Sequence, residues 1–265
     1  MASILILGTP DLALADTSGA TGQAATVQLL GQPAVSTGQV AASNDGISQT
    51  KTGNSTPSLS ILGVQTILSD GSLFQDAVAN NDGTSAACAG IIGANGAIQI
   101  GPSQSCLVSG APSGVVLNLG LAVLRADVIT AECTASSNGT TTGSATLANA
   151  RITDPTGSIT LLSLPINPAP NTGLSLPGIV DLILNKQSSG GPGQLSVTAL
   201  DLNVLGGLNL ARVQLGIVTC GPNAQTGPIP LLSSAGLPVA GGTVLASASV
   251  FWFIRRRRAS TPTNA

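Results

Sequence analysis

The segment QLSVTALDLNV, residues 194–204, decides the fold class of this chain. Apolar and polar residues alternate along most of it, which is the period of a β-strand with one buried and one exposed face. The segment RADVITAEC, residues 125–133, shows the same alternation. Shorter apolar runs that we also assign to strands lie at 96–100, 114–119, 144–152, 158–163, 178–185 and 211–219.

Turn signals separate these runs. Asn-Gly and Asp-Gly pairs accept the positive φ angles of tight hairpins. Such pairs, or Gly-Gly, occur at Asn44-Asp45-Gly46, Asp82-Gly83, Asn95-Gly96, Asn138-Gly139 and Gly206-Gly207. Three apolar stretches run into such a turn, at 40–46, 77–83 and 131–139. This recurrence has two explanations, duplication of a hairpin unit or repeated use of the same turn chemistry.

These patterns predict an all-β fold, an antiparallel β-sandwich-like body. We expect either one body or two β subdomains, over residues 16–112 and 113–222. A linker rich in Pro, Gly and Ser is expected at 223–236. A single transmembrane helix is expected within 237–265.

Composition argues against several classes of function. Charged residues make up 8% of the chain, whereas a soluble cytosolic domain has about 25%. The net charge is −2 although four of the nine basic residues are clustered at 255–258, so the remaining surface should repel nucleic acid. Histidine and tyrosine are absent, which removes the usual general base and the commonest transition-metal ligand. We expect no cofactor and no metal site.

The four cysteines are Cys88, Cys106, Cys133 and Cys220. No Cys-x-x-Cys motif is present and the spacing does not suggest zinc. In an exported protein an even number of cysteines predicts two disulfides. Of the three possible pairings we favour Cys88–Cys106 with Cys133–Cys220, because each bond then lies within one of the two β regions. The alternative is a set of buried, reduced thiols.

The C-terminal segment 237–265 combines three features in order. A pentapeptide, Leu237-Pro238-Val239-Ala240-Gly241, precedes an apolar stretch that ends at Ile254, and four arginines follow, Arg255, Arg256, Arg257 and Arg258. The stretch from Ala235 to Ile254 is 20 residues, enough for a helix that spans a hydrocarbon core of about 30 Å. The arginines are expected to hold the tail on the cytoplasmic side.

This order resembles the sorting signal of sortase-anchored surface proteins of Gram-positive bacteria. The resemblance implies that a sortase-type transpeptidase cleaves between Ala240 and Gly241 and joins the Ala240 carbonyl to an amine of cell-wall peptidoglycan. Ala240 departs from the family pattern, in which threonine is usual. The alternative is a single-pass membrane anchor that is not cleaved. In both cases the body is expected on the extracellular face.

The N-terminal residues fit the end of an export signal. Ala13-Leu14-Ala15 before Asp16 has the small-x-small pattern of a signal-peptide cleavage site. The preceding apolar run, Ile4–Leu7, is short and no basic residue comes before it. We therefore expect residues 1–15 to be a signal-peptide remnant whose first part is encoded upstream of Met1.

Five spaced segments in the second half resemble one family of secreted proteins. They are LRADVITAEC at 124–133, GSATL at 143–147, PNT at 170–172, DLILNKQ at 181–187 and LSVTAL at 195–200. Over roughly residues 113–220 the chain resembles the choice-of-anchor P family, actinobacterial secreted proteins whose β-rich body is joined to differing C-terminal anchors. Lys186 stands where the family pattern has an acidic residue. The resemblance implies location and architecture and carries no catalytic activity.

Few residues suit catalysis. A serine nucleophile would depend on Lys51 or Lys186 as its base, and no G-x-S-x-G motif is present. A carboxylate pair for glycoside hydrolysis is conceivable, but carbohydrate sites usually have aromatic platforms and the body offers only Phe74. The candidate carboxylates are Asp127, Glu132, Asp181 and Asp201.

Two other kinds of site are weighed. Turn aspartates could bind Ca²⁺, although solvated turns are the favoured interpretation; they are Asp45, Asp70, Asp76 and Asp82. A Lys–Asn isopeptide cross-link could involve Lys186 and Glu132, although two exposed strand charges are favoured.

We therefore expect a non-enzymatic protein of the cell surface, anchored to the cell wall or membrane, with a structural or adhesive role and an extracellular ligand. The alternative is a secreted hydrolase or carbohydrate-active domain.

Overall fold

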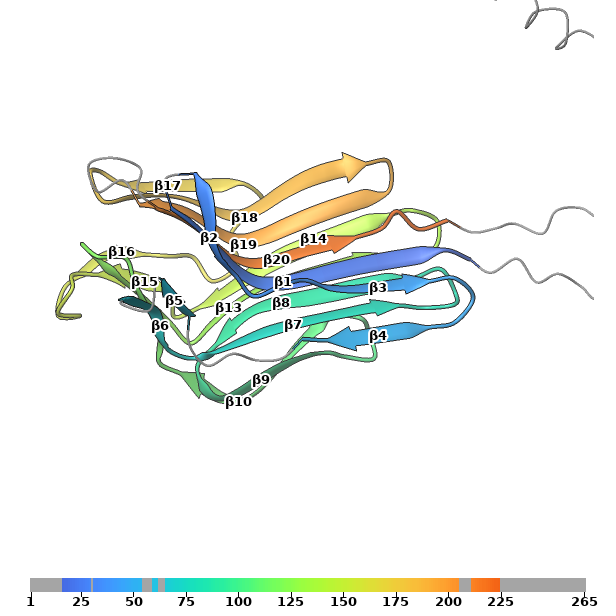
Figure 1. Ribbon diagram of the computed structural model, residues 1–265, viewed down its shortest axis with the longest axis horizontal. Coiled ribbons are helices and arrows are strands. Elements are labelled where there is room, and N and C mark those ends of the chain that lie inside the picture. Colours follow the sequence, from blue (N-terminus) through green and yellow to red (C-terminus); the bar gives the residue numbers. More distant parts are fainter. Residues whose placement is uncertain (1–15, 30, 54–58, 62–64, 205–210, 225–265) are drawn as a thin grey trace, which may run out of the picture. The chain divides into compact units, whose positions relative to one another are not determined.

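The computed structural model describes residues 16–29, 31–53, 59–61, 65–204 and 211–224. In these residues the chain forms strands and turns and no helix, and every strand pair is antiparallel (Figure 1). The expected all-β fold of antiparallel sheets is confirmed. The predicted transmembrane helix lies outside the described residues.

The largest sheet has seven strands. Its order is β17 (Thr172–Leu176), β18 (Val180–Gly191), β19 (Gln194–Val204), β20 (Ala211–Cys220), β1 (Ser18–Leu29) and β2 (Gln32–Ser36), and β3 (Val40–Asn44) also pairs with β1. The predicted strand at 194–204 is β19, which lies inside this sheet.

A second sheet has five strands. Its order is β14 (Thr141–Ala148), β13 (Val128–Ala135), β8 (Ser85–Ile92), β7 (Ser72–Ala79) and β4 (Gln49–Thr52). Both sheets combine strands from the two regions predicted at 16–112 and 113–222, since β1 pairs with β20 and β8 pairs with β13. The described residues accordingly belong to one compact unit.

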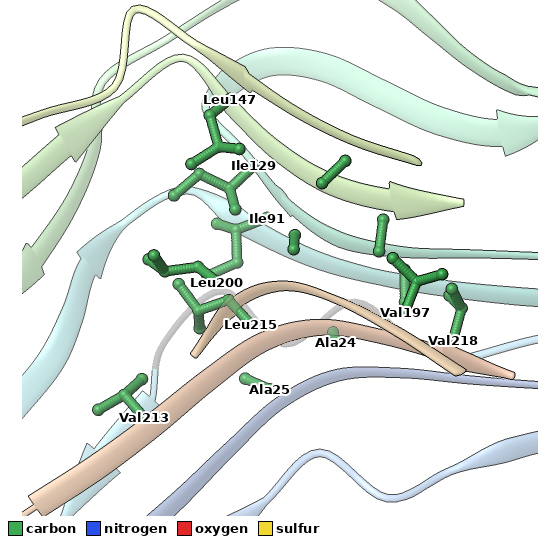
Figure 2. Close-up of a cluster of buried hydrophobic side chains, with 14 of the residues drawn as sticks. Ala24, Ala25, Ile91, Ile129, Leu147, Val197, Leu200, Val213, Leu215 and Val218 are labelled. Atoms are coloured by element: carbon green, nitrogen blue, oxygen red, sulfur yellow. The ribbon is translucent and has the colours of Figure 1, made fainter. Parts of the chain in front are cut away.

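The seven-stranded and five-stranded sheets pack face to face. Strands β1 and β20 contact β7, β8 and β13, and β19 contacts β13 and β14. Their buried side chains meet in one apolar cluster, where Leu200 and Leu215 from one sheet face Ile91 and Ile129 from the other (Figure 2). Burial of these side chains is the main stabilising contribution of the fold.

The two sheets approach each other closely at Gly216 of β20. A β-carbon on Gly216 would lie 2.8 Å from the Ala89 carbonyl oxygen and 3.1 Å from the Ala131 nitrogen, both in the facing sheet. Its φ of 59° is also in the left-handed region. Only glycine satisfies both conditions without strain.

A third sheet extends the core beyond this pair. Its order is β16 (Thr160–Ser163), β15 (Arg151–Thr153), β12 (Val123–Ala126), β11 (Val115–Asn118), β6 (Gln65–Asp70) and β5 (Leu59–Ile61). Strand β6 runs into β7 at Gly71, and β12 runs into β13 at Asp127. Leu117, Leu124 and Ile152 are fully buried and belong to the main apolar cluster.

A hairpin of β9 (Ala94–Ile100) and β10 (Cys106–Ser113) covers the other face of the five-stranded sheet. Cys88, Ile92, Ile98 and Val128 form a small apolar cluster beneath it, separate from the main one. Strand β8 is therefore covered on both faces, which is why all eight of its residues are buried.

The predicted turns have different outcomes. Asp82-Gly83 and Asn138-Gly139 lie in turns of the same form, with Asn80 and Thr84 hydrogen-bonded in the first and Ser136 and Thr140 in the second. Asn95-Gly96 lies in a tight turn as expected, since Asn95 has a φ of 63° and the Gly96 nitrogen donates to the Gly93 carbonyl, but this turn leads from β8 into β9 of another sheet and does not form a hairpin. Asn44-Asp45-Gly46 connects β3 and β4, which belong to different sheets.

Candidate functional site

The structure contains two disulfides, with the pairing favoured from the sequence. Cys88 is bonded to Cys106 and Cys133 to Cys220, with Cα–Cα distances of 5.7 and 5.9 Å. The first bond fastens the β9–β10 hairpin to β8. The second joins β13 to β20 and so connects the five-stranded sheet to the seven-stranded sheet.

The carboxylates considered for hydrolysis lie on different strands or connections, and each has its own partner. Asp127 Oδ2 accepts from Asn149 at 2.5 Å, and Asp181 Oδ1 accepts from the Ser175 hydroxyl at 2.5 Å. Glu132 accepts from the Cys106 backbone nitrogen at 2.9 Å and from Ser144 at 2.8 Å. These contacts tie neighbouring segments of the sheets together.

Asp201 is the most deeply buried of these carboxylates. It is 2% exposed and accepts hydrogen bonds from Lys186 at 2.6 Å and from Arg212 at 2.7 and 2.5 Å. Burial alone would raise the pKa of Asp201, but the hydrogen bonds and positive charges of Arg212 and Lys186 outweigh it and hold the pKa below its usual value. The two side chains weighed for an isopeptide cross-link have other partners, since the Lys186 ammonium donates to Asp201 and Glu132 accepts from Cys106 and Ser144.

The aspartates considered for calcium do not form a cluster. Asp82 caps its own turn by accepting from the Thr84 nitrogen and hydroxyl, which lowers the pKa of Asp82. Within the described part of the chain, no three His, Cys, Asp or Glu side chains lie together as metal ligands. Asp76 stands apart from the other aspartates because it lies in a cavity.

This cavity, of about 350 Å³, lies between β4, β7 and the turn that joins β9 to β10. We name it the Asp76 cavity. Its polar lining residues are Thr50, Thr52, Asp76, Asn80, Gln99 and Gln104, and its apolar ones include Val78, Ile100 and Pro102. Of these residues only Asp76 carries an ionisable side chain.

Local structure explains why Asp76 lies in the cavity. On β7, side chains alternate, so Leu73, Gln75 and Ala77 face the main core whereas Asp76 faces the β9–β10 hairpin. Asp76 is also paired in register with Cys88 of β8. The Cys88–Cys106 disulfide therefore fixes the hairpin over the sheet next to this carboxylate.

Asp76 is a buried carboxyl group with few partners. The residue is 7% exposed, and burial raises the pKa of its carboxyl group, although a hydrogen bond with the Thr52 side chain opposes this effect. Its Oδ1 is shielded from solvent and has no hydrogen-bond partner. Buried polar atoms are nearly always paired, so a buried carboxylate with an unpaired oxygen, on the wall of a cavity, makes this cavity the candidate site.

A second cavity, of about 250 Å³, lies beside Glu132 and is lined also by Ser105, Thr134, Thr142 and Ser144. Both carboxylate oxygens of Glu132 are already hydrogen-bonded. The Asp76 cavity is thus the stronger candidate. The sequence placed Asp76 among turn aspartates and gave no signal for its polar neighbours, which come from three separate segments.

The sorting motif Leu237–Gly241 and the arginines Arg255–Arg258 lie outside the described residues. In the residues that are described, no helix is long and apolar enough to cross a membrane.

Comparisons with known proteins assign no family. No protein-family model matches the chain, and no curated protein matches it. A crystal structure of a DUF1329 family protein from Desulfovibrio piger aligns with 83% of this chain and 88% of that chain, at 9% sequence identity and a TM-score of 0.15. A TM-score this low carries no argument about fold or function.

Proposed function

We propose that this chain is a non-enzymatic cell-surface protein with a structural or adhesive role, held at the extracellular face by its C-terminal segment. The observation that carries the proposal is the pair of disulfides in an all-β body. Disulfides form and persist in oxidising compartments and are rare in the cytosol. The body therefore belongs outside the cell.

Attachment is the second part of the proposal. The order of pentapeptide, apolar stretch and four arginines supports a sortase-type transpeptidase as partner and peptidoglycan as the acceptor. Transpeptidation would break the Ala240–Gly241 peptide bond and form an amide between the Ala240 carbonyl and a wall amine. The resemblance to the choice-of-anchor P family, and the β-rich secreted body that it implies, support the same placement.

Cell fractionation tests this function. Cells that produce the full chain are treated with a muralytic enzyme or with detergent alone, and the released protein is mapped by mass spectrometry. We expect the muralytic enzyme to release a species that lacks Trp252 and ends at Ala240 with a wall fragment attached. Pro238→Ala should leave the exported protein in the membrane fraction, and the matched change Pro228→Ala should not.

Two results would contradict parts of the proposal. Extraction of the whole population by detergent, with Trp252 present, would replace sorting with simple membrane anchoring. Recovery of the protein in the cytoplasm with four reactive thiols would overturn the surface location itself.

A further inference from the structure

We propose that the Asp76 cavity binds a small organic cation, whose primary ammonium group lies against the Asp76 carboxylate and whose polar skeleton is held by the surrounding hydroxyl and amide groups. This inference goes beyond the surface function proposed above and does not depend on how the chain is anchored.

The first step concerns the unpaired acceptor. Asp76 is 7% exposed, is the most deeply buried side chain in the cavity lining, and has an oxygen without a hydrogen-bond partner. Leaving such a group unpaired destabilises a folded protein. A positive group in the cavity, against the part of the carboxylate that remains exposed, would compensate the buried negative charge.

The second step concerns the charge of the ligand. Asp76 provides the cavity's one carboxylate, and neither Lys nor Arg lines it. A desolvated carboxylate without a cation nearby attracts a positive group and repels an anion, and hydrogen bonds between charged partners are about twice as strong as neutral ones. An ammonium group supplies the counter-charge that the cavity lining lacks.

The third step separates an organic cation from a metal ion. Ca²⁺ takes 6–8 oxygen ligands and usually several carboxylates, whereas the lining offers a single carboxylate. The volume of about 350 Å³ lies in the range of small-molecule sites. The hydroxyls of Thr50 and Thr52 and the amides of Asn80 and Gln99 can hydrogen-bond to hydroxyl or amide groups of a ligand.

The walls of the cavity are also fixed before a ligand arrives. The Gln104 amide donates to the Thr84 hydroxyl at 2.7 Å, and the Asn80 amide donates to the same oxygen at 3.0 Å. The Cys88–Cys106 disulfide holds the hairpin that carries Gln99 and Gln104. Such preorganisation lowers the entropy that binding must overcome.

Paired probes test this inference on the disulfide-bonded protein. Glucosamine and ethanolamine carry an ammonium group, and N-acetylglucosamine and ethylene glycol are their neutral counterparts. Binding is followed by NMR titration, using the side-chain amide signals of Asn80, Gln99 and Gln104, at low ionic strength. We expect at least one ammonium probe to shift these signals, with its neutral counterpart at least tenfold weaker.

Variants then assign the binding to Asp76. Asp76→Asn should weaken the ammonium probe at least tenfold, whereas Asp45→Asn, which removes an equal charge outside the cavity, should leave the affinity unchanged. Thermal unfolding confirms that each variant is folded.

Three results would overturn the inference: no binding of either ammonium probe, equal binding of the neutral counterparts, or equal binding of the ammonium probe to Asp76→Asn. Tight binding of Ca²⁺ without the ammonium probes would make the cavity a metal site and would also overturn it.

Discussion

Cys133 and Cys220 are bonded to each other across the interface between the two facing sheets, and both are fully shielded from solvent. They are 87 residues apart in the chain. Their bond joins β13 to the end of β20, the last strand of the body, whereas Cys88–Cys106 spans 18 residues and fastens only a hairpin. The Cys133–Cys220 disulfide therefore connects the two facing sheets, whereas the Cys88–Cys106 disulfide holds one hairpin in place.

Removal of the longer bond should destabilise the whole body. Cys133→Ala with Cys220→Ala releases a long loop in the unfolded chain, and the chain-entropy model gives a loss on the order of 4–5 kcal/mol. Cys88→Ala with Cys106→Ala releases a short loop, for which the model gives about 3 kcal/mol. Chemical denaturation of both double variants measures the difference. A larger loss for the Cys88–Cys106 pair would contradict this assignment.

A methyl group at Gly216 should separate the facing sheets. Gly216→Ala places a β-carbon against the backbone at Ala89 and Ala131 and requires a left-handed conformation, for a combined cost of about 2–4 kcal/mol. Gly173→Ala on the edge strand β17 is the matched control, because nothing lies within 4 Å of its β-carbon. Equal midpoints of urea denaturation for the two variants would show that the sheets do not pack closely at Gly216.

The sequence predicts the strands in which apolar and polar residues alternate, even where both faces are largely buried in the structure. β13 and β19 were both expected from alternation, and both are present. β8, with the sequence SAACAGII, has small residues and no alternation, because the seven-stranded sheet covers one of its faces and the hairpin covers the other. The periodicity of the sequence does not show that the β9–β10 hairpin covers the second face of β8. For this reason β8 was not predicted.

The Asp76 cavity could not be predicted for a related reason. Its lining comes from β4, β7 and the β9–β10 region, which the register of β7 and the Cys88–Cys106 bond bring together. Alternation does place the Asp76 side chain on one face of β7 and the Gln75 and Ala77 side chains on the other face. Alternation does not show that the β9–β10 hairpin covers this face of β7. That cover is the reason why Asp76 is buried.

Asp201 should make the protein sensitive to acid. Because the pKa of Asp201 is lowered in the folded state, its stabilising effect is present above the ordinary value near 3.8 and is lost as the pH falls through the lower, folded value. Asp201→Asn should cost about 1–3 kcal/mol at pH 7, less than a fully buried ion pair, because Lys186 and Arg212 are about one-third exposed.

Urea denaturation of wild type and Asp201→Asn from pH 7 to pH 2.5 measures this effect. The difference in unfolding free energy between wild type and Asp201→Asn should be constant down to about pH 4 and should become smaller below it. Asp181→Asn serves as the control, because Asp181 has a hydroxyl partner and no cation. A difference that does not change with pH would mean that the charge of Asp201 does not contribute.

Asp76 should have the opposite dependence. Burial raises the pKa of Asp76 in the folded state, so any stabilising effect is present at low pH and is lost as the pH rises through the folded value. At pH 7 the ionised group should cost stability, and Asp76→Asn should raise the unfolding free energy by about 1 kcal/mol. At pH 3 the two proteins should be nearly equal. A variant less stable than wild type at pH 7 would indicate a structural role for this carboxylate.

The four arginines should retain the chain at the membrane before any transpeptidation. A cluster of positive charges after an apolar stretch stops transfer of the tail, since arginine in the hydrocarbon core is costly. Replacement of Arg255, Arg256, Arg257 and Arg258 with glutamine should let part of the exported protein pass into the medium, with Trp252 still in the chain. Four glutamines at 260–263 are the control, since they alter the tail to a similar extent and leave its charge unchanged. Quantitative immunoblotting of medium, wall and membrane fractions measures the distribution.

If the arginine variant is retained and processed as in wild type, the proposal that the charged tail retains the chain is wrong. The pentapeptide must then be presented to the transpeptidase by another means.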